Sequence, residues 1–185
     1  PSEDREVQCR LLRLPSDTFN IAFIGPPVAQ KGYPQLREAV AGMSEVRLIL
    51  LGRDMITKTD PQVAFAGVVP HADVPRYLAA CDIFVLPTFI EGSSNAVIEA
   101  MACGLPIVTS NGRHMDDLVD ADVAIRVDPQ DVNAIRNAIV QLKNNPERCM
   151  NMSKAGLRKA KQFDINVRAR RVTEWMREIA STISR

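Results

Sequence analysis

The stretch of this sequence most able to do chemistry is Glu91–Asn95, an acid followed by a glycine, two serines and an asparagine. It comes directly after the short apolar run Ile83–Leu86, which is typical of a buried strand, and before a segment with helical character. The glycine and serines let a phosphate or sugar approach the backbone closely. The free N–H groups and positive dipole end of the following helix favour an anion there.

Two carboxylates bracket this stretch, because Glu99 follows Glu91 with seven residues between them. Glu91 is expected in the loop and Glu99 about one turn into the helix, so both can face one cleft at the strand ends. A carboxylate accepts hydrogen bonds in pairs, which suits vicinal sugar hydroxyls. Alternatively, Glu91 caps the helix and Glu99 is solvated, although the residues around Glu99, Ile98 and Ala100, are apolar.

A second motif, Phe23–Gly32, runs from an apolar segment into a loop that ends in Lys31 and Gly32 just before a helical pattern. A lysine in this position can reach a phosphate as a point charge. It can equally be an ordinary surface lysine. The motif is neither a dinucleotide-binding fingerprint nor a Walker loop, because the required glycines and the Ser/Thr are missing.

Six short apolar runs alternate with helical patterns, which predicts a parallel sheet with crossover helices. Runs that are continuous rather than alternating indicate strands buried on both faces. We therefore predict an α/β fold, a Rossmann-like doubly wound sheet of about six parallel strands with helices on both faces. Ligands of such sheets bind beyond the carboxyl ends of the strands. The predicted strands are Ile21–Ile24, Val46–Leu51, Val63–Ala66, Ile83–Leu86, Ile107–Thr109 and Val123–Val127.

Apolar residues at helical spacing predict six helices within residues 20–185, which we interpret as one domain with C-terminal helices. Asp73 and Asp131 are predicted caps, and Gly104 is a predicted helix stop. Residues 1–19 contain one short helical run, Glu3–Leu14, and are interpreted as an interdomain linker or peripheral helix outside the core. The predicted helices are Tyr33–Met43, Asp73–Cys81, Asn95–Cys103, Asp131–Lys143, Pro146–Gln162 and Asn166–Ser181.

Composition narrows the classes of partner. The net charge of +1 over 185 residues and an aromatic content of 5% argue against nucleic-acid binding. No stretch approaches the length of a membrane span. The four cysteines have no C-x-x-C spacing, and Cys81 and Cys103 are expected in the core, so we expect a reducing, cytoplasmic compartment. His71 and His114 stand apart from other ligand types, so no required metal is predicted.

The C-terminal segment is rich in basic residues, and we interpret it as a solvated helix face. Contact with an anionic membrane, at its inner face, is the alternative. Trp175 and Met176 are expected to pack in the core or against another domain. The basic residues are Lys154, Arg158, Lys159, Lys161, Arg168, Arg170 and Arg171.

The segment from Glu91 to Pro106 resembles the signature of retaining glycosyltransferases of the GT-B fold, in the large glycosyltransferase family 4 (group 1). In that signature two glutamates are separated by seven residues. Phe65–Val68 and Cys81–Pro87 are similar to accompanying blocks of the family. The resemblance covers about residues 20–179 and corresponds to the C-terminal, donor-binding domain.

The resemblance implies a role for each matched position. Glu99 would hold the ribose hydroxyls, and Glu91 would contact the donor sugar. Lys31, after Gly25, would neutralise the diphosphate, and Val68 would lie near the base. Backbone groups of Gly92, Ser93, Ser94 and Asn95 would meet the sugar and diphosphate.

The implied reaction moves a hexose from a UDP-, GDP- or ADP-sugar to an acceptor hydroxyl with retention, with Glu91 and Lys31 as the catalytic residues. An N-terminal acceptor-binding domain, which precedes this chain, would complete the cleft, so the chain alone is expected to bind donor without efficient transfer.

One position departs from the family. Pro26 stands where the family has an arginine that clamps the diphosphate, which removes a bidentate donor and its charge. Arg53 is one cation that can compensate. A catalytically decayed binding module of the same fold is therefore the alternative function. An unrelated doubly wound domain, such as a sugar-phosphate epimerase or a receiver-like domain, lacks a matching fingerprint or acidic pocket after the first strand.

Overall fold

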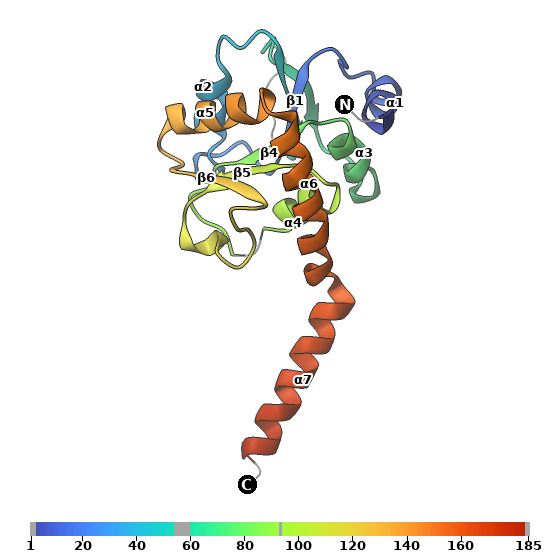
Figure 1. Ribbon diagram of the computed structural model, residues 1–185, viewed down its shortest axis with the longest axis vertical. Coiled ribbons are helices and arrows are strands. Elements are labelled where there is room, and N and C mark those ends of the chain that lie inside the picture. The colour runs from blue at the N-terminus through green and yellow to red at the C-terminus, as the bar shows by residue number, and fades with distance from the viewer. Residues whose placement is uncertain (1–2, 54–59, 93, 184–185) are drawn as a thin grey trace.

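The chain folds around a six-stranded parallel sheet, seen in a computed structural model that describes residues 3–53, 60–92 and 94–183 (Figure 1). The strand order is β3-β2-β1-β4-β5-β6, and every neighbouring pair is parallel, as predicted. The strands are β1 (Phe19–Ile24), β2 (Val46–Leu51), β3 (Val63–Gly67), β4 (Ile83–Leu86), β5 (Ile107–Ser110) and β6 (Ala124–Val127). The order reverses between β1 and β4, so the loops that follow these two strands lie at the topological switch point.

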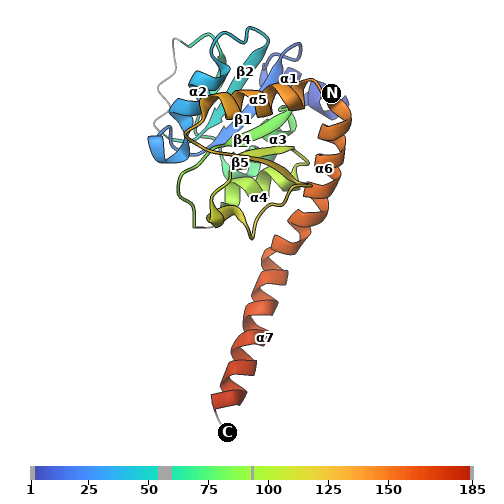
Figure 2. The same ribbon diagram turned by 60° about the vertical axis from the view of Figure 1, so that its left-hand side comes forward.

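Helices cover both faces of this sheet, which confirms the predicted fold class. The helix α2 packs against α5 on one face, and α4 packs against α6 and α3 on the other (Figure 2). The helices are α1 (Glu3–Leu12), α2 (Tyr33–Val40), α3 (Val74–Ala79), α4 (Asn95–Ala102), α5 (Val132–Lys143), α6 (Pro146–Ala160) and α7 (Ile165–Ile183). In the described part of the chain they are accompanied by the 3-10 turns η1 (Ala29–Lys31), η2 (His71–Asp73), η3 (Arg113–Met115) and η4 (Lys161–Phe163).

The core lies along the central strands, whose side chains are buried on both faces. Phe23 of β1 and Phe84 of β4 are fully buried, and all four residues of β4 and of β5 are buried. By contrast, β3 at the edge is only partly buried throughout. The predicted burial on both faces is therefore confirmed for central strands such as β4 and β5, and it is wrong for β3, whose apolar run lies at the edge of the sheet.

Of the two N-cap residues predicted from the sequence, one is confirmed. The Asp131 carboxylate accepts a hydrogen bond from the Ala134 N–H at 2.9 Å and caps α5. The predicted Asp73 cap of α3 is wrong, since no side-chain bond caps that helix. Asp73 has helical φ and ψ as the last residue of η2, whereas a capping residue needs an extended backbone, and its carboxylate contacts Arg76 instead.

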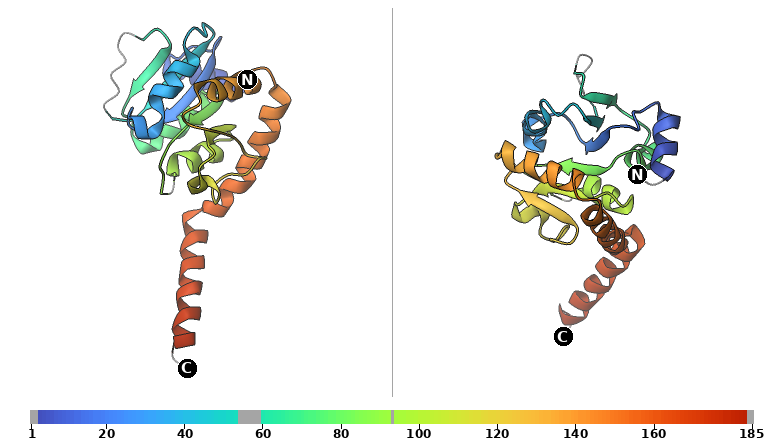
Figure 3. Two further views of the ribbon diagram at one scale, coloured as in Figure 1. Left: turned by 90° about the vertical axis from the view of Figure 1, so that its left-hand side faces the viewer. Right: turned by 45° about the horizontal axis from the view of Figure 1, so that its top comes forward.

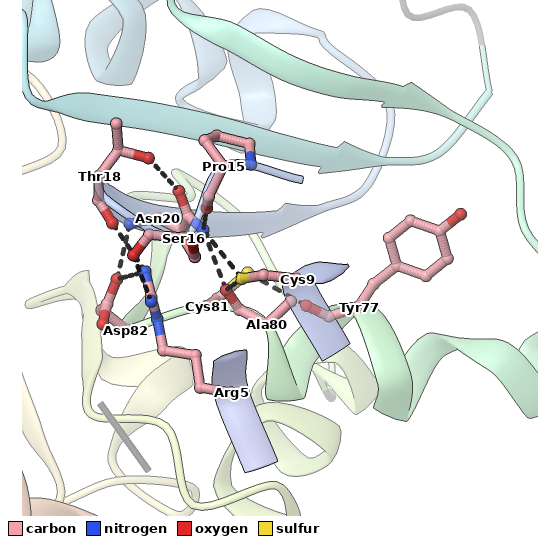
Figure 4. Close-up of polar contacts among 10 residues, drawn as sticks. All are labelled: Arg5, Cys9, Pro15, Ser16, Thr18, Asn20, Tyr77, Ala80, Cys81 and Asp82. Carbon is pink, nitrogen blue, oxygen red and sulfur yellow. Dashed lines mark hydrogen bonds and ion pairs between the residues drawn. The ribbon is translucent and has the colours of Figure 1, made fainter. Parts of the chain in front are cut away.

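The prediction that residues 1–19 lie outside the core is wrong. Cys9 and Leu14 are buried in the main core cluster, and Arg5 is only 4% exposed. The Arg5 guanidinium donates to Asp82 Oδ2 at 2.8 Å and to the carbonyl of Thr18 at 2.7 Å (Figure 4). An arginine gives no apolar signal in sequence, so this buried ion pair between α1 and the start of β4 could not be foreseen.

The last helix, α7, projects away from the body of the domain (Figures 1 and 3). Trp175 and Met176 on it are each 60% exposed, so the prediction that they pack in the core is wrong, and packing against another domain stays a prediction. Within the described residues, no helix is both long and apolar enough to cross a membrane.

Candidate functional site

The carboxyl ends of β1 and β4 bring two of the predicted site residues into contact. Lys31 Nζ, after β1, lies 2.5 Å from Glu91 Oε1, after β4. Both side chains are mostly buried, with exposed fractions of 25% for Lys31 and 10% for Glu91. The aliphatic stem of Lys31 lies near Gly25, since a Cβ at that glycine would meet it at 3.8 Å. Residues 60 positions apart thus form one charged pair at the switch point.

Backbone contacts between the two loops set this geometry. The Phe89 N–H donates to the Gln30 carbonyl at 2.8 Å, and the buried Thr88 hydroxyl lies 3.0 Å from the same oxygen. The loop after β4 is therefore bound to η1, which carries Lys31. One main-chain bond and one hydroxyl bond thus join the two loops in addition to the ion pair between Lys31 and Glu91.

Gly32 permits this close approach. It has a left-handed φ of 70°, and a Cβ there would overlap the carbonyl group of Pro87. A side chain at this position would be strained by its φ and would push the two loops apart.

We predict that Gly32→Ala destabilises the fold by at least about 2 kcal/mol, from positive φ and backbone overlap together. Urea unfolding checks this value. Gly92→Ala is the matched control, because a Cβ at Gly92 meets nothing within 4 Å and its φ is not positive. Equal stability of Gly32→Ala and wild type would show that the two loops separate at little cost.

The start of α4 lies next to Glu91 along the chain. Ser94 is 3% exposed and occupies the N-cap position, but its side chain makes no capping hydrogen bond. Gly92 and Asn95 are exposed on either side, and the predicted site residue Ser93 lies outside the described residues. The first N–H groups of a helix have no intrahelical partner, so this helix start can accept an anion.

Glu99, in the second turn of α4, contacts a residue that sequence reasoning set aside. Its Oε1 lies 3.1 Å from His71 Nε2 in η2, so His71 does not stand alone. Val68, the predicted base-side residue, precedes η2 and is 68% exposed. One sequence feature could have pointed to His71: it lies shortly after the Phe65–Val68 block, at the carboxyl end of a predicted strand.

Two other polar residues that sequence analysis considered, His114 and Arg53, also follow strands of this sheet. His114 Nε2 lies 3.0 Å from the hydroxyl of the buried Ser110, which fixes its ring beside β5. Arg53, the predicted compensating cation, is exposed after β2. Among the described residues, no group of three or more His, Cys, Asp or Glu has the arrangement of a metal site.

Comparison with known proteins identifies the chain. Residues 18–145 match the family of group 1 glycosyl transferases. The O-antigen chain mannosyltransferase B of Escherichia coli is 38% identical over 101 residues, which are 55% of this chain and 26% of that protein. The matched part of the chain therefore spans about a quarter of the length of this relative.

Solved structures share the fold at low sequence identity. HepE of Anabaena, in complex with UDP, has a TM-score of 0.80 at 20% identity and covers 96% of this chain and 53% of its own. The C-terminal domain of LpcC, a group 1 family protein from Francisella tularensis, has a TM-score of 0.73 at 20% identity and covers 88% of this chain and 93% of its own. From these matches and the Rossmann-like parallel sheet, we conclude that the chain belongs to the group 1 family of GT-B glycosyltransferases.

Proposed function

We propose that the chain is the donor-binding domain of a retaining glycosyltransferase that moves a hexose from a nucleoside diphosphate sugar to an acceptor hydroxyl. The observation that carries the proposal is the contact of Lys31 with Glu91 at the switch point, beside the start of α4. A cation and free helix amides there match the diphosphate of such a donor, and a carboxylate matches its sugar hydroxyls.

Each group has a distinct part in this proposal. Lys31 and the amides at the start of α4 stabilise the charge that develops on the departing diphosphate. Glu91 binds a hydroxyl of the sugar, Glu99 binds the ribose, and Val68 lies against the base. Gly25 leaves room for the diphosphate beside the stem of Lys31. Support comes from the family match over residues 18–145 and from the UDP bound by HepE, a protein of the same fold.

Direct titration tests this function. We expect UDP, GDP or ADP to raise the melting temperature of the chain and to give a saturable heat in calorimetry. The three nucleotides differ only in the base, so their order of affinity also identifies the base. The proposal is overturned if none of the three binds at millimolar concentration while the protein is folded.

The departure at Pro26 leads to a second test. We predict that Pro26→Arg raises diphosphate affinity by at least about tenfold, because a bidentate arginine contact is worth roughly 1.5–3 kcal/mol. Measured with inorganic pyrophosphate, such a gain would favour the alternative function, a binding module whose catalytic site has decayed. Unchanged affinity would mean that another cation, such as Arg53, already serves this role.

We also propose that α7 packs on an N-terminal acceptor-binding domain of the same protein. Four of its apolar side chains are exposed at spacings of three and four residues, which makes one face of the helix: Val172, Trp175, Met176 and Ile179. The chain covers only 53% of the HepE chain, which leaves a second half of similar size to cover that face.

For this contact we predict that Trp175→Glu leaves the melting temperature of the present chain unchanged, because Trp175 is 60% exposed in it. In a protein that includes the N-terminal half, we expect the same change to lower stability by about 2 kcal/mol or more, through a buried charge. Residues 146–185 hold ten basic and four acidic residues, so sedimentation with anionic vesicles is run in parallel. If Trp175→Glu abolishes vesicle binding but leaves the stability of the protein with the N-terminal half unchanged, a membrane contact of α7 is favoured instead.

A further inference from the structure

The contact between His71 and Glu99 joins two elements on the β3 side of the candidate site. Glu99 comes from α4, whose start forms the anion site, and His71 comes from η2, which follows Val68 at the end of β3. Glu99 is assigned to the ribose, and His71 follows three residues after Val68, which is assigned to the base. His71 therefore lies where a nucleoside would bind.

The backbone of His71 is well defined by its neighbours. Pro70 precedes it with φ −54°, and the Pro70 carbonyl accepts the Asp73 N–H at 2.9 Å, which closes the turn. The Val74 N–H in turn donates to the His71 carbonyl at the start of α3. A defined backbone leaves the ring the few staggered rotamers of the side chain, one of which places it against Glu99.

The hydrogen bond fixes one oxygen of Glu99 and leaves the other free. An ionised carboxylate only accepts hydrogen bonds, so His71 Nε2 must be the donor to Glu99 Oε1. The second oxygen, Oε2, then has a defined direction and can accept hydrogen bonds from ribose hydroxyls. Glu99 is 30% exposed, which leaves it accessible to such a ligand.

We infer that His71 is a positioning residue of the donor site: it orients the Glu99 carboxylate for the ribose of a nucleoside diphosphate. This inference rests on the proposed function. The side chain of His71 is 87% exposed, so its contact with Glu99 contributes little to the stability of the fold. Its effect becomes large only when a bound nucleoside excludes water from the pair, because hydrogen bonds to charged groups strengthen in a drier environment.

The test compares two probes on the same chain: the tightest binder among UDP, GDP and ADP, and inorganic pyrophosphate, which has no ribose. We expect His71→Ala to weaken binding of the nucleoside diphosphate about three- to tenfold, a range set by the loss of one hydrogen bond. Binding of pyrophosphate and the melting temperature should not change. His71→Gln, which keeps an N–H donor, should recover most of the affinity.

Two controls separate positioning from a general effect on this segment. Arg76→Ala removes another exposed ion pair, with Asp73 at 3.4 Å, and should leave affinity at the wild-type value. In a Glu99→Ala background, His71→Ala should cause no further loss, since the two changes remove one interaction. Equal affinity of His71→Ala and wild type, or an equal loss in both backgrounds, would overturn the inference. Failure of the wild type to bind any of the three nucleotides would instead refute the proposed function, and the inference with it.

Discussion

Replacement of Lys31 by methionine is expected to lower the affinity of the chain for a nucleoside diphosphate by at least about tenfold, because it removes a cation from a partly desolvated anion site. Methionine keeps most of the aliphatic stem over Gly25, so the fold should be retained. Titration calorimetry with the tightest binder among UDP, GDP and ADP measures the effect. Lys154→Met, an exposed lysine on α6, is the matched control and should bind like wild type.

The opposite change at the same pair should have the opposite sign. Glu91 Oε1 lies 2.5 Å from Lys31 Nζ and neutralises its charge. Glu91→Gln removes this counter-charge, and we expect pyrophosphate to bind about two- to fivefold more tightly to this variant, a modest gain because the glutamine oxygen can still accept a hydrogen bond from Lys31. A loss of pyrophosphate affinity in both variants would show that the ion pair holds the loops in place rather than competing with the anion.

The second large effect is expected far from this site, at the amino ends of the strands, where Asp82 precedes β4. We predict that Arg5→Met destabilises the fold by about 3–5 kcal/mol, because it leaves a buried carboxylate without its cation. Asp82 is 19% exposed, and Arg5 is also bonded to the Ser16 carbonyl at 3.1 Å and the Thr18 carbonyl at 2.7 Å. Urea unfolding at neutral pH measures the loss.

The pH dependence identifies the cause of that loss. Burial raises the pKa of the Asp82 carboxyl above its ordinary value, although the Asn20 N–H and the Arg5 guanidinium act to lower it. Because the folded state holds this proton more tightly than the unfolded state, Asp82 favours folding at low pH, and that contribution falls as the pH rises through the raised pKa. Without Arg5 the pKa of Asp82 should rise further, so Arg5→Met should destabilise the fold more at neutral pH than in acid, where Asp82 takes up a proton.

A double variant provides the control. Arg5→Met combined with Asp82→Asn removes both charges of this pair. The Asn20 N–H, which donates to Asp82 Oδ2 at 2.7 Å, can still donate to the asparagine oxygen. We expect the double variant to recover at least half of the stability lost in Arg5→Met. If it is no more stable than the single variant, packing of the arginine stem, rather than the unpaired charge, accounts for the loss.

The strands, most helices and the fold class follow from patterns that are visible in the sequence. Residues such as Phe23 and Phe84 lie in short apolar runs because strands covered on both faces need no polar alternation, and this pattern is visible without coordinates. The predicted stop at Gly104 also holds, since its φ of 75° suits glycine beyond a helix end. Local periodicity and turn chemistry are properties of neighbouring residues, and a sequence displays them directly.

Which distant side chains come into contact depends on the tertiary structure. Strand order places the loops of β1 and β4 together, and so brings Lys31 to Glu91 across 60 positions. The same holds for Arg5 with Asp82 and for His71 with Glu99, since Arg5, Asp82 and His71 taken alone resemble ordinary surface residues. Such pairs depend on sheet topology and on the burial of polar groups, which are long-range properties that spacing along the chain does not encode.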